Sequence, residues 1–181
     1  MHLETSRLIL RLWRKSDLDG FAELNADSQV MRHFPACLTR QQSDALAERC
    51  QGYIESQGWG FWAIEEKASG QFVGFTGLHH QPEKFSFSPC TEIGWRLHRR
   101  FWGRGYATEA AIVCLDYAFD DLGLLEVVAF TAHSNHRSEA VMRRLGMSFK
   151  QTFLHPDVDP ESSLSTHLLY GIEQGQYRRA V

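Results

Sequence analysis

The sequence has little cysteine, no long apolar run and no excess of basic residues. Its 4 cysteines, at positions 37, 50, 90 and 114, lie far apart and form no C-x-x-C pair. Such spacing is typical of reduced thiols in a cytosolic protein rather than of a disulfide framework. No segment approaches the roughly 20 apolar residues of a membrane span, and no apolar run follows a basic start. We therefore expect a cytoplasmic protein without a membrane partner.

The charge balance and the composition exclude two further classes of protein. Lysine and arginine number 19, against 22 aspartate and glutamate residues, and the net charge is -3. Such a chain lacks the basic surface that nucleic-acid binding requires. With 43% hydrophobic and 23% charged residues, it has the composition of a globular rather than a disordered protein. At 181 residues we expect one domain, spanning residues 1–181, and no nucleic-acid partner.

Hydrophobic periodicity predicts strands and helices in a mixed order. Residues 7–13 alternate apolar and charged side chains, as a half-buried strand does. The further predicted strands are residues 61–66, 72–78, 91–97, 126–132, 147–153 and about 165–172. The first predicted helix begins after Ser16 and ends near residue 27, and the second begins at about Thr39 and ends at residue 56, with Ser16 and Thr39 as caps. Two further helices are predicted for residues 106–121 and 135–145. This order predicts an α+β fold, in which helices pack on a twisted mixed sheet with an antiparallel run at its centre.

The string RFWGRG, at residues 100–105, stands between a predicted strand and a predicted helix. The first N–H groups of a helix have no internal partner and the helix dipole adds positive charge, so an anion fits there. Gly103 and Gly105 leave room for phosphate oxygens and can adopt positive φ. Arg99, Arg100 and Arg104 add charge at the rim. Two glycines before a helix also mark ordinary turns, so the spacing alone supports an anion site and a simple turn about equally.

Neighbouring motifs favour the anion site. The turn resembles the Q/R-x-x-G-x-G/A signature of the GNAT acetyltransferase superfamily, with Arg100, Gly103 and Gly105 at the signature positions. The segments VGFTGL, EIGWRL, NHRS and RLGM occur in that superfamily's order and spacing. The opening TSRLILRLW and the N-x-x-S element most resemble the branch that acetylates N-terminal amines of ribosomal proteins. The resemblance implies a mostly antiparallel twisted sheet with helices on both faces and a V-shaped splay between strands four and five, here residues 92–97 and 126–132.

The same resemblance implies an enzyme that binds acetyl-coenzyme A and transfers its acetyl group directly to a primary amine. In this fold the strand before the splay meets the pantetheine arm and the thioester, and Gly94 suits a bulge or a close approach there. Asn135 matches an asparagine that contacts the pantetheine, and it is also a preferred helix cap. The implied acetyl-coenzyme A contacts are Ile93, Gly94, Trp95, Arg96, Leu97, Arg100, Trp102, Gly103, Arg104, Gly105, Tyr106, Ala107, Thr108, Asn135 and Ser138.

Two residues are the candidate catalytic groups. Glu92 begins the strand that should face the thioester, so we expect it to act as the base, through water, although a surface carboxylate is an equally supported reading. His79 and His80 are alternative bases near the expected acceptor entrance. Ser138 matches the serine that this branch places near the departing thiolate, and no tyrosine occurs between residues 117 and 170 to replace it as the acid.

The acceptor is the open question. The branch favours a protein N-terminal α-amine, and the alternatives are a small amine (a polyamine, an antibiotic or an amino acid) or a non-catalytic acyl-coenzyme A sensor. Asp157, Asp159 and Glu161 are either a solvated charge run or an attraction for a cationic acceptor. His133 and His136 lack a third ligand, so we predict no metal. The resemblance leaves a monomer and a homodimer equally open.

Overall fold

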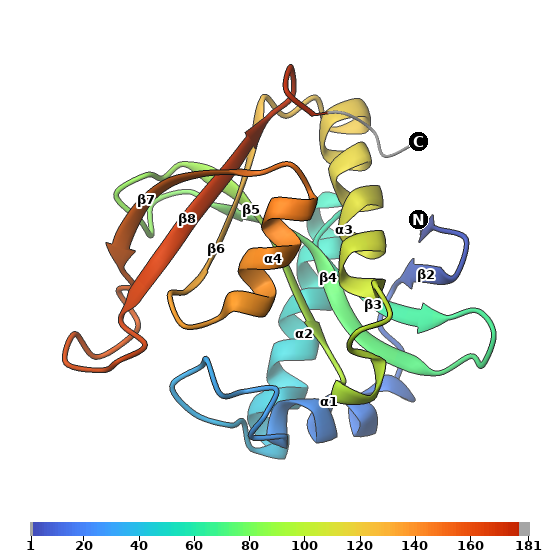
Figure 1. Ribbon diagram of the computed structural model, residues 1–181. Helices are drawn as coiled ribbons and strands as arrows, with labels where there is room; N and C mark the ends of the chain where they lie inside the picture. Colours follow the sequence, from blue (N-terminus) through green and yellow to red (C-terminus); the bar gives the residue numbers. More distant parts are fainter. Residues whose placement is uncertain (1, 178–181) are drawn as a thin grey trace.

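A twisted eight-stranded sheet organises the protein (Figure 1), for which a computed structural model describes residues 2–177. The strands are β1 (Leu3–Glu4), β2 (Leu8–Arg11), β3 (Phe61–Glu66), β4 (Phe72–Gln81), β5 (Cys90–Leu97), β6 (Glu126–Ala132), β7 (Ser148–Leu154) and β8 (Thr166–Glu173). The helices are α1 (Asp17–Ala26), α2 (Arg40–Gln57), α3 (Tyr106–Asp116) and α4 (His136–Arg144), with short turns η1 (Arg99–Phe101) and η2 (Tyr117–Asp121). The α+β prediction is confirmed.

The sheet is splayed between β5 and β6. Its strand order is β1-β2-β3-β4-β5-β6-β8-β7, and β5 and β6, joined through α3, are its parallel neighbours. Within the described residues the register between β5 and β6 consists of one pair, Glu92 with Val128. By contrast, β4 and β5 pair continuously from Gly74 with Leu97 to Gln81 with Cys90. The predicted V-shaped splay is therefore confirmed.

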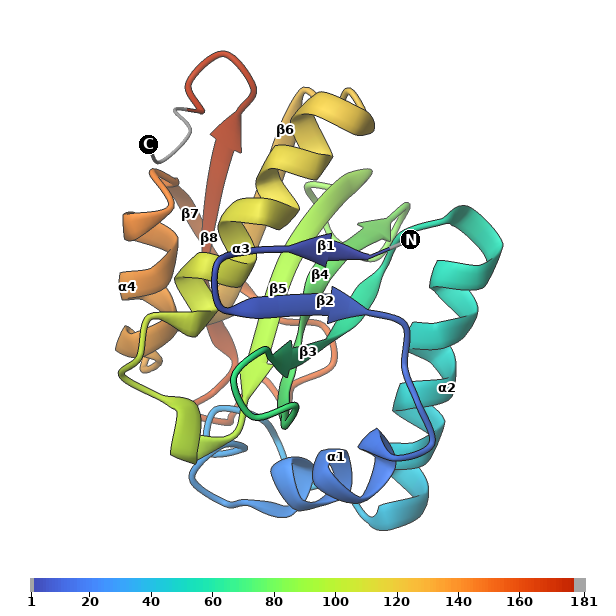
Figure 2. The ribbon, with the colours of Figure 1, turned by 90° about the vertical axis from the view of Figure 1, so that its right-hand side faces the viewer.

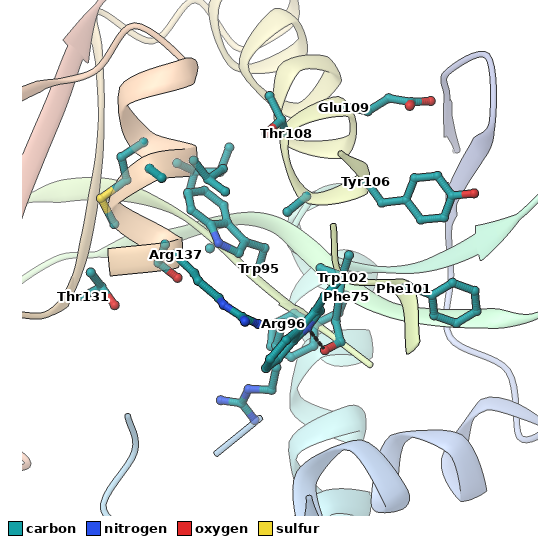
Figure 3. Close-up of a pocket in the computed structure, with 18 of the residues that line it drawn as sticks. Phe75, Trp95, Arg96, Phe101, Trp102, Tyr106, Thr108, Glu109, Thr131 and Arg137 are labelled. Carbon is teal, nitrogen blue, oxygen red and sulfur yellow. Dashed lines mark hydrogen bonds between the residues drawn. The ribbon is translucent and has the colours of Figure 1, made fainter. Parts of the chain in front are cut away.

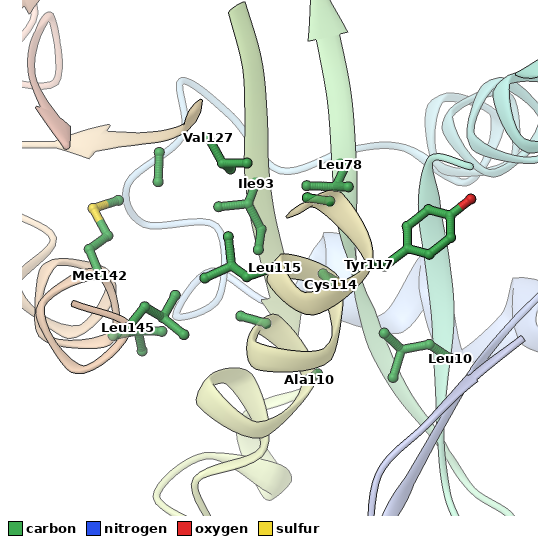
Figure 4. Packing of buried hydrophobic residues seen from close by; sticks show 14 of the residues in the cluster. Leu10, Leu78, Ile93, Ala110, Cys114, Leu115, Tyr117, Val127, Met142 and Leu145 are labelled. Carbon is green, nitrogen blue, oxygen red and sulfur yellow. The ribbon is translucent and has the colours of Figure 1, made fainter. Parts of the chain in front are cut away.

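Helices cover both faces of the sheet, as predicted. Figure 2 shows α3 and α4 on one side of the sheet and α2 on the other, with α1 beside α2. The larger core cluster lies between the sheet and α3 and α4 (Figure 4). There Ile93 and Leu78 of the sheet meet Cys114 and Leu115 of α3 and Met142 of α4, and all five side chains are buried. This packing holds the start of α3 and the start of α4 beside the splay.

Helices α1 and α2 begin where the sequence predicts, but the predicted side-chain cap of α1 is not formed. Thr39 forms a capping box with Gln42, in which each side chain bonds the other residue's backbone N–H. Ser16 stands at the start of α1 without a side-chain capping bond. The buried Asp17 carboxylate instead accepts the Arg14 N–H and a bidentate pair of bonds from Arg11. The prediction of Ser16 as a capping side chain is therefore wrong.

Most boundaries differ from the predicted ones by one or two residues, and three differences are larger in kind. The two-residue strand β1 is too short for alternation to reveal it. Strand β4 continues through polar residues to Gln81 because the Gln81 side chain bonds to Glu92 on the next strand. The helix predicted for residues 106–121 ends at Asp116 as an α-helix and continues as one π-helical turn.

Candidate functional site

A cavity of about 1560 Å³ opens along the splay. Its walls are β5, the first turns of α3 and α4, part of β6 and the segment between α1 and α2. Pockets for one drug-sized ligand measure roughly 300–1,000 Å³, so this cavity has room for two molecules together. Figure 3 shows its centre, where Trp95 stands between α3 and α4. The site is therefore built where the sheet lacks strand pairing.

The turn before α3 is built for an anion. Gly103 and Gly105 have φ of 76° and 79°, in the left-handed region that side chains other than glycine rarely adopt. The first intrahelical bond runs from the Glu109 N–H to the Gly105 carbonyl, at 3.0 Å. The N–H groups of Tyr106, Ala107 and Thr108 thus have no acceptor within the helix, and all three residues line the cavity. These free N–H groups and the helix dipole favour an anion at this place, and binding of an anion there stays a prediction.

Two predicted arginines do not reach this cavity. Within residues 2–177, its walls include neither Arg100 nor Arg104. The Arg104 guanidinium bonds Glu66 at 3.3 Å, and both guanidinium groups lie over the Phe101 ring. The Tyr106 hydroxyl also donates to Glu66, so the ring points away from α4 (Figure 3) and Tyr106 offers the cavity its backbone. A direct contact of the two arginine side chains with a bound anion therefore remains a prediction.

Another arginine, on α4, does line the cavity. Arg137, on α4, lines the cavity, and its guanidinium lies 4.7 Å from the centre of the Trp102 ring. Figure 3 shows Arg137 extending from α4 toward Trp102. The Trp102 indole donates to the Leu97 carbonyl at 2.8 Å, which occupies the last acceptor of β5. Arg137 lies inside the NHRS motif, but the sequence gives no sign that its side chain lines the cavity.

Strand β5 divides its side chains between the two faces. Ile93, Trp95 and Leu97 pack on the side of α3 and α4, and alternation places Glu92, Gly94 and Arg96 on the side of α1 and α2. The register with β4 shows no bulge at Gly94, where a Cβ would lie 3.2 Å from the Phe61 ring. The Phe61 ring therefore lies close to Gly94, the predicted bulge is not formed, and a close approach of the pantetheine there stays a prediction.

The main chain of Trp95 faces the splay. The His98 N–H donates to the Val73 carbonyl at 2.9 Å, which sets the phase of hydrogen bonding between β4 and β5. In an antiparallel ladder, residues alternate between bonding the neighbour and pointing away from it. The N–H and C=O of Trp95 accordingly point away from β4 and into the cavity. This strand thus offers unpaired backbone groups to a ligand.

Glu92 lies on the cavity wall within a polar network. Its Oε1 accepts from the Gln81 side chain at 2.9 Å and lies 3.2 Å from His79 Nδ1. The carboxylate side chain is 15% exposed, enough for water to reach it. His79 packs against the rings of Tyr53 and Phe61, behind Glu92. His80 is exposed on the opposite face, so Glu92 and His79 are the two candidates that the structure brings together.

Asn135 and Ser138 form one unit at the start of α4. The Asn135 Oδ1 accepts the Ser138 N–H at 3.3 Å, which is the helix cap, and its Nδ2 donates to Ser138 Oγ at 3.1 Å. The same Nδ2 donates to Thr131 Oγ1 at 2.9 Å. Both residues line the cavity. The capping role of Asn135 is confirmed, and most of its amide is already engaged.

Comparison with known proteins agrees with this geometry. The acetyltransferase (GNAT) domain family matches residues 7–148. The chain belongs to the GNAT acetyltransferase family. An acetyltransferase of the GNAT family from Bacillus anthracis has the same fold, with a TM-score of 0.82 and 22% identity over 97% of this chain and 99% of its own. The GNAT resemblance of the sequence is thereby confirmed.

Relatives of this GNAT chain act on different acceptors. FsC-acetyl coenzyme A-N(2)-transacetylase of Aspergillus fumigatus is 36% identical over 129 residues, or 68% of this chain and 50% of that protein. YdaF of Bacillus subtilis, named as a candidate ribosomal N-acetyltransferase, is 32% identical over 77 residues, which cover 42% of this chain and 40% of its own. Spermidine N(1)-acetyltransferase of Escherichia coli is 24% identical over 156 residues, covering 81% of this chain and 75% of its own.

The segment between α1 and α2 closes the other side of the cavity, and the sequence analysis assigned it no role. Val30, Arg32, His33 and Phe34 of this segment line the cavity, and His33 Nδ1 lies 3.2 Å from Ser134 Oγ beside α4.

Asp157, Asp159 and Glu161 do not line the cavity, and Asp157 pairs with Lys84. Among residues 2–177 no cluster of three His, Cys, Asp or Glu side chains could hold a metal ion. In the same range, no helix is both long and apolar enough to cross a membrane.

Proposed function

We propose that this protein transfers the acetyl group of acetyl-coenzyme A to a primary amine of the α-amine type. The observation that carries the proposal is one continuous cavity that runs from the free N–H groups of α3, past the unpaired backbone of Trp95, to Glu92. The α3 end suits a pyrophosphate, and the Glu92 end suits an amine that must lose a proton. The amine nitrogen bonds to the thioester carbon, the carbon–sulfur bond breaks, and the thiolate leaves.

Glu92 and Ser138 are proposed to handle the two protons. Glu92, through a water molecule, accepts the proton that the attacking nitrogen loses. The Ser138 hydroxyl donates a hydrogen bond to the departing thiolate on the other side of the splay. At pH 7 a lysine amine needs about 4 to 5 kcal/mol to lose its proton, whereas an α-amine needs about 1 kcal/mol. A single carboxylate acting through water therefore suits an α-amine.

The charges of the cavity argue against a polyamine. Its walls hold four carboxylates, of which Glu4 pairs with Lys67, Glu109 pairs with Arg7, and Asp116 bonds the Tyr177 hydroxyl. Glu92 is the fourth. Four arginines face them from the same walls: Arg32, Arg96, Arg137 and Arg144. The walls therefore lack the excess of carboxylates that would attract a polycation, and a molecule with one amine suits them better. A protein N-terminus and a small amino compound both present such an amine.

Thiol release from acetyl-coenzyme A in the presence of amines tests the proposal. The panel contains a tripeptide with a free N-terminus, small amino compounds and spermidine, and we expect the α-amines to react faster than spermidine. Ser138→Ala should lower turnover about 100-fold while the dissociation constant of acetyl-coenzyme A stays within about twofold. Ser56→Ala, which removes an exposed hydroxyl outside the cavity, is the matched control. Tight binding of acetyl-coenzyme A with no thiol release from any amine would instead support a non-catalytic sensor.

A further inference from the structure

Arg96 is a half-buried cation without a carboxylate partner. Its Nη1 donates to Asn25 Oδ1 at 2.6 Å, and its guanidinium lies 4.2 Å from the Phe34 ring centre and 5.3 Å from that of Phe75. No carboxylate of residues 2–177 forms an ion pair with it, and its buried Nε has no hydrogen-bond partner there. Burial lowers the pKa of Arg96 to about 10, which still leaves the group charged at neutral pH.

The surroundings hold this cation in place. Asn25 is fully buried on α1, and its Nδ2 donates to the buried Ser43 hydroxyl at 2.9 Å. That bond turns the Asn25 oxygen toward Arg96. Two rings pack against the guanidinium from β4 and from the segment between the helices. Charged groups enclosed in this way are ordinarily paired, and an amide oxygen compensates for only part of the charge.

The position of Arg96 links it to the acceptor rather than to the coenzyme A end. Arg96 lies on the same face of β5 as Glu92, and both line the cavity. The anion site at α3 faces the opposite side of the sheet, where Trp95 and Leu97 point. Arg32 and His33 line the cavity on the same side as Arg96 and bring further donors. An anion that enters beside Glu92 would therefore meet this group of donors.

We propose that Arg96 binds an anionic group of the acceptor, which is then a small molecule carrying both a primary amine and a carboxylate or a phosphonate-like anion. This inference rests on the proposed function, because it names the substrate class of that site. Residues two apart on a strand are separated by about 7 Å, so an amine near Gly94 and an anion at Arg96 would lie several bonds apart in one molecule. The favoured class is thus a dipeptide, which has an α-amine several bonds away from its anion, rather than a simple α-amino acid.

The experiment compares acceptors that differ in one charge. Glycylglycine is measured against glycylglycinamide, alanylalanine against alanylalaninamide, and glycylaminomethylphosphonate tests the second kind of anion. We expect the wild-type protein to prefer each anion over its uncharged partner at least tenfold in kcat/KM. The same preference should appear in calorimetric binding to the protein saturated with coenzyme A, so the result does not depend on turnover. Equal values for acids and amides in both measurements would overturn the proposal.

Asn25→Asp is the decisive variant. It keeps the shape of the side chain and places a carboxylate on Arg96, which neutralises the cation without removing it. If Arg96 recognises an anion, the variant loses the preference for the acids while its affinity for coenzyme A and its melting temperature are kept. If Arg96 only ties β5 to α1, the variant leaves the preference unchanged. Arg96→Gln should also abolish the preference, and an equal loss for acids and amides in that variant would count against the proposal.

The two proposals fail in different ways. A protein that binds the anions in preference to the amides but releases no thiol with any amine would contradict the proposed function and leave anion binding by Arg96 standing. A protein that acetylates acids, amides and spermidine equally well would confirm an N-acetyltransferase and refute the role of Arg96.

Discussion

Asn135 donates a hydrogen bond to the hydroxyl oxygen of Ser138, with 3.1 Å between Nδ2 and Oγ. A hydroxyl that accepts this bond keeps its own hydrogen available for another acceptor. Because Ser138 lines the cavity, that acceptor can be the sulfur of a departing thiolate. We therefore propose that Asn135 is a positioning residue, which sets the direction in which Ser138 donates.

Asn135→Asp tests this direction. Aspartate caps a helix as well as asparagine does, so the melting temperature should change little. Its carboxylate accepts where the amide donated, so the Ser138 hydroxyl turns toward it and away from the cavity. We expect kcat to fall nearly as far as in Ser138→Ala, and the double variant to be no slower than the slower single variant. Additive losses in that cycle would show that the two residues act independently.

Glu92→Gln should lower kcat/KM for an amine about 100-fold, because glutamine keeps the bond to Gln81 but cannot accept a proton. His79→Gln should have a smaller effect, since His79 lies behind the carboxylate. Thiol release by the two variants, measured side by side from pH 6 to 9, shows which of the two residues the reaction depends on. If His79→Gln abolishes activity while Glu92→Gln retains it, the histidine is the base.

Gly105→Ala should weaken coenzyme A binding about tenfold. A side chain at φ 79° costs about 1–2 kcal/mol, and relief of that strain moves the first N–H groups of α3. Gly123→Ala is the matched control, because Gly123 also has positive φ (63°), follows η2 and does not line the cavity. Both variants should lose similar stability in thermal melts. Equal loss of coenzyme A affinity in both would contradict the anion site.

His167 should make the protein sensitive to acid. Burial and, to a smaller extent, the nearby His155 lower the pKa of His167 to about 4; the two ring centres lie 4.7 Å apart. An unfolded histidine binds its proton near pH 6.5, so the unfolded state gains a proton first as the pH falls from about 6.5 to 4, and stability is lost across that window. The loss from this residue is at most about 3 kcal/mol.

His167→Phe checks that origin by denaturant unfolding at pH 7 and pH 4.5. We expect the variant to lose less stability between the two values than the wild-type protein does. His133→Asn, which changes an exposed histidine, should keep the wild-type sensitivity. An unchanged difference in His167→Phe would place the acid sensitivity in other groups, among them His155, whose pKa burial also lowers.

Local signals in the sequence predict most of the fold and the conformation of the glycine turn before α3. Alternation predicts the strands and capping residues help to predict the helices. The two glycines of the turn indicate backbone with positive φ, which both residues adopt. The acceptor end depends on contacts between distant residues, such as Arg96 with Asn25, 71 positions away. The segment of residues 29–34 has no periodicity to mark it. Charge alone suggested that Arg104 faces the cavity, whereas Glu66, on a strand far earlier in the chain, draws it aside.

Because of the splay, β5 and β6 in the middle of the sheet are almost unpaired with each other. A central strand is ordinarily the most protected part of a protein, yet the Trp95 amide lies on such a strand with no strand on its open side. Its hydrogen should therefore exchange with deuterated solvent as quickly as that of an edge strand, and slow sharply when coenzyme A is added. In the free protein this side of β5 has no partner strand, and we expect bound coenzyme A to take the place of one.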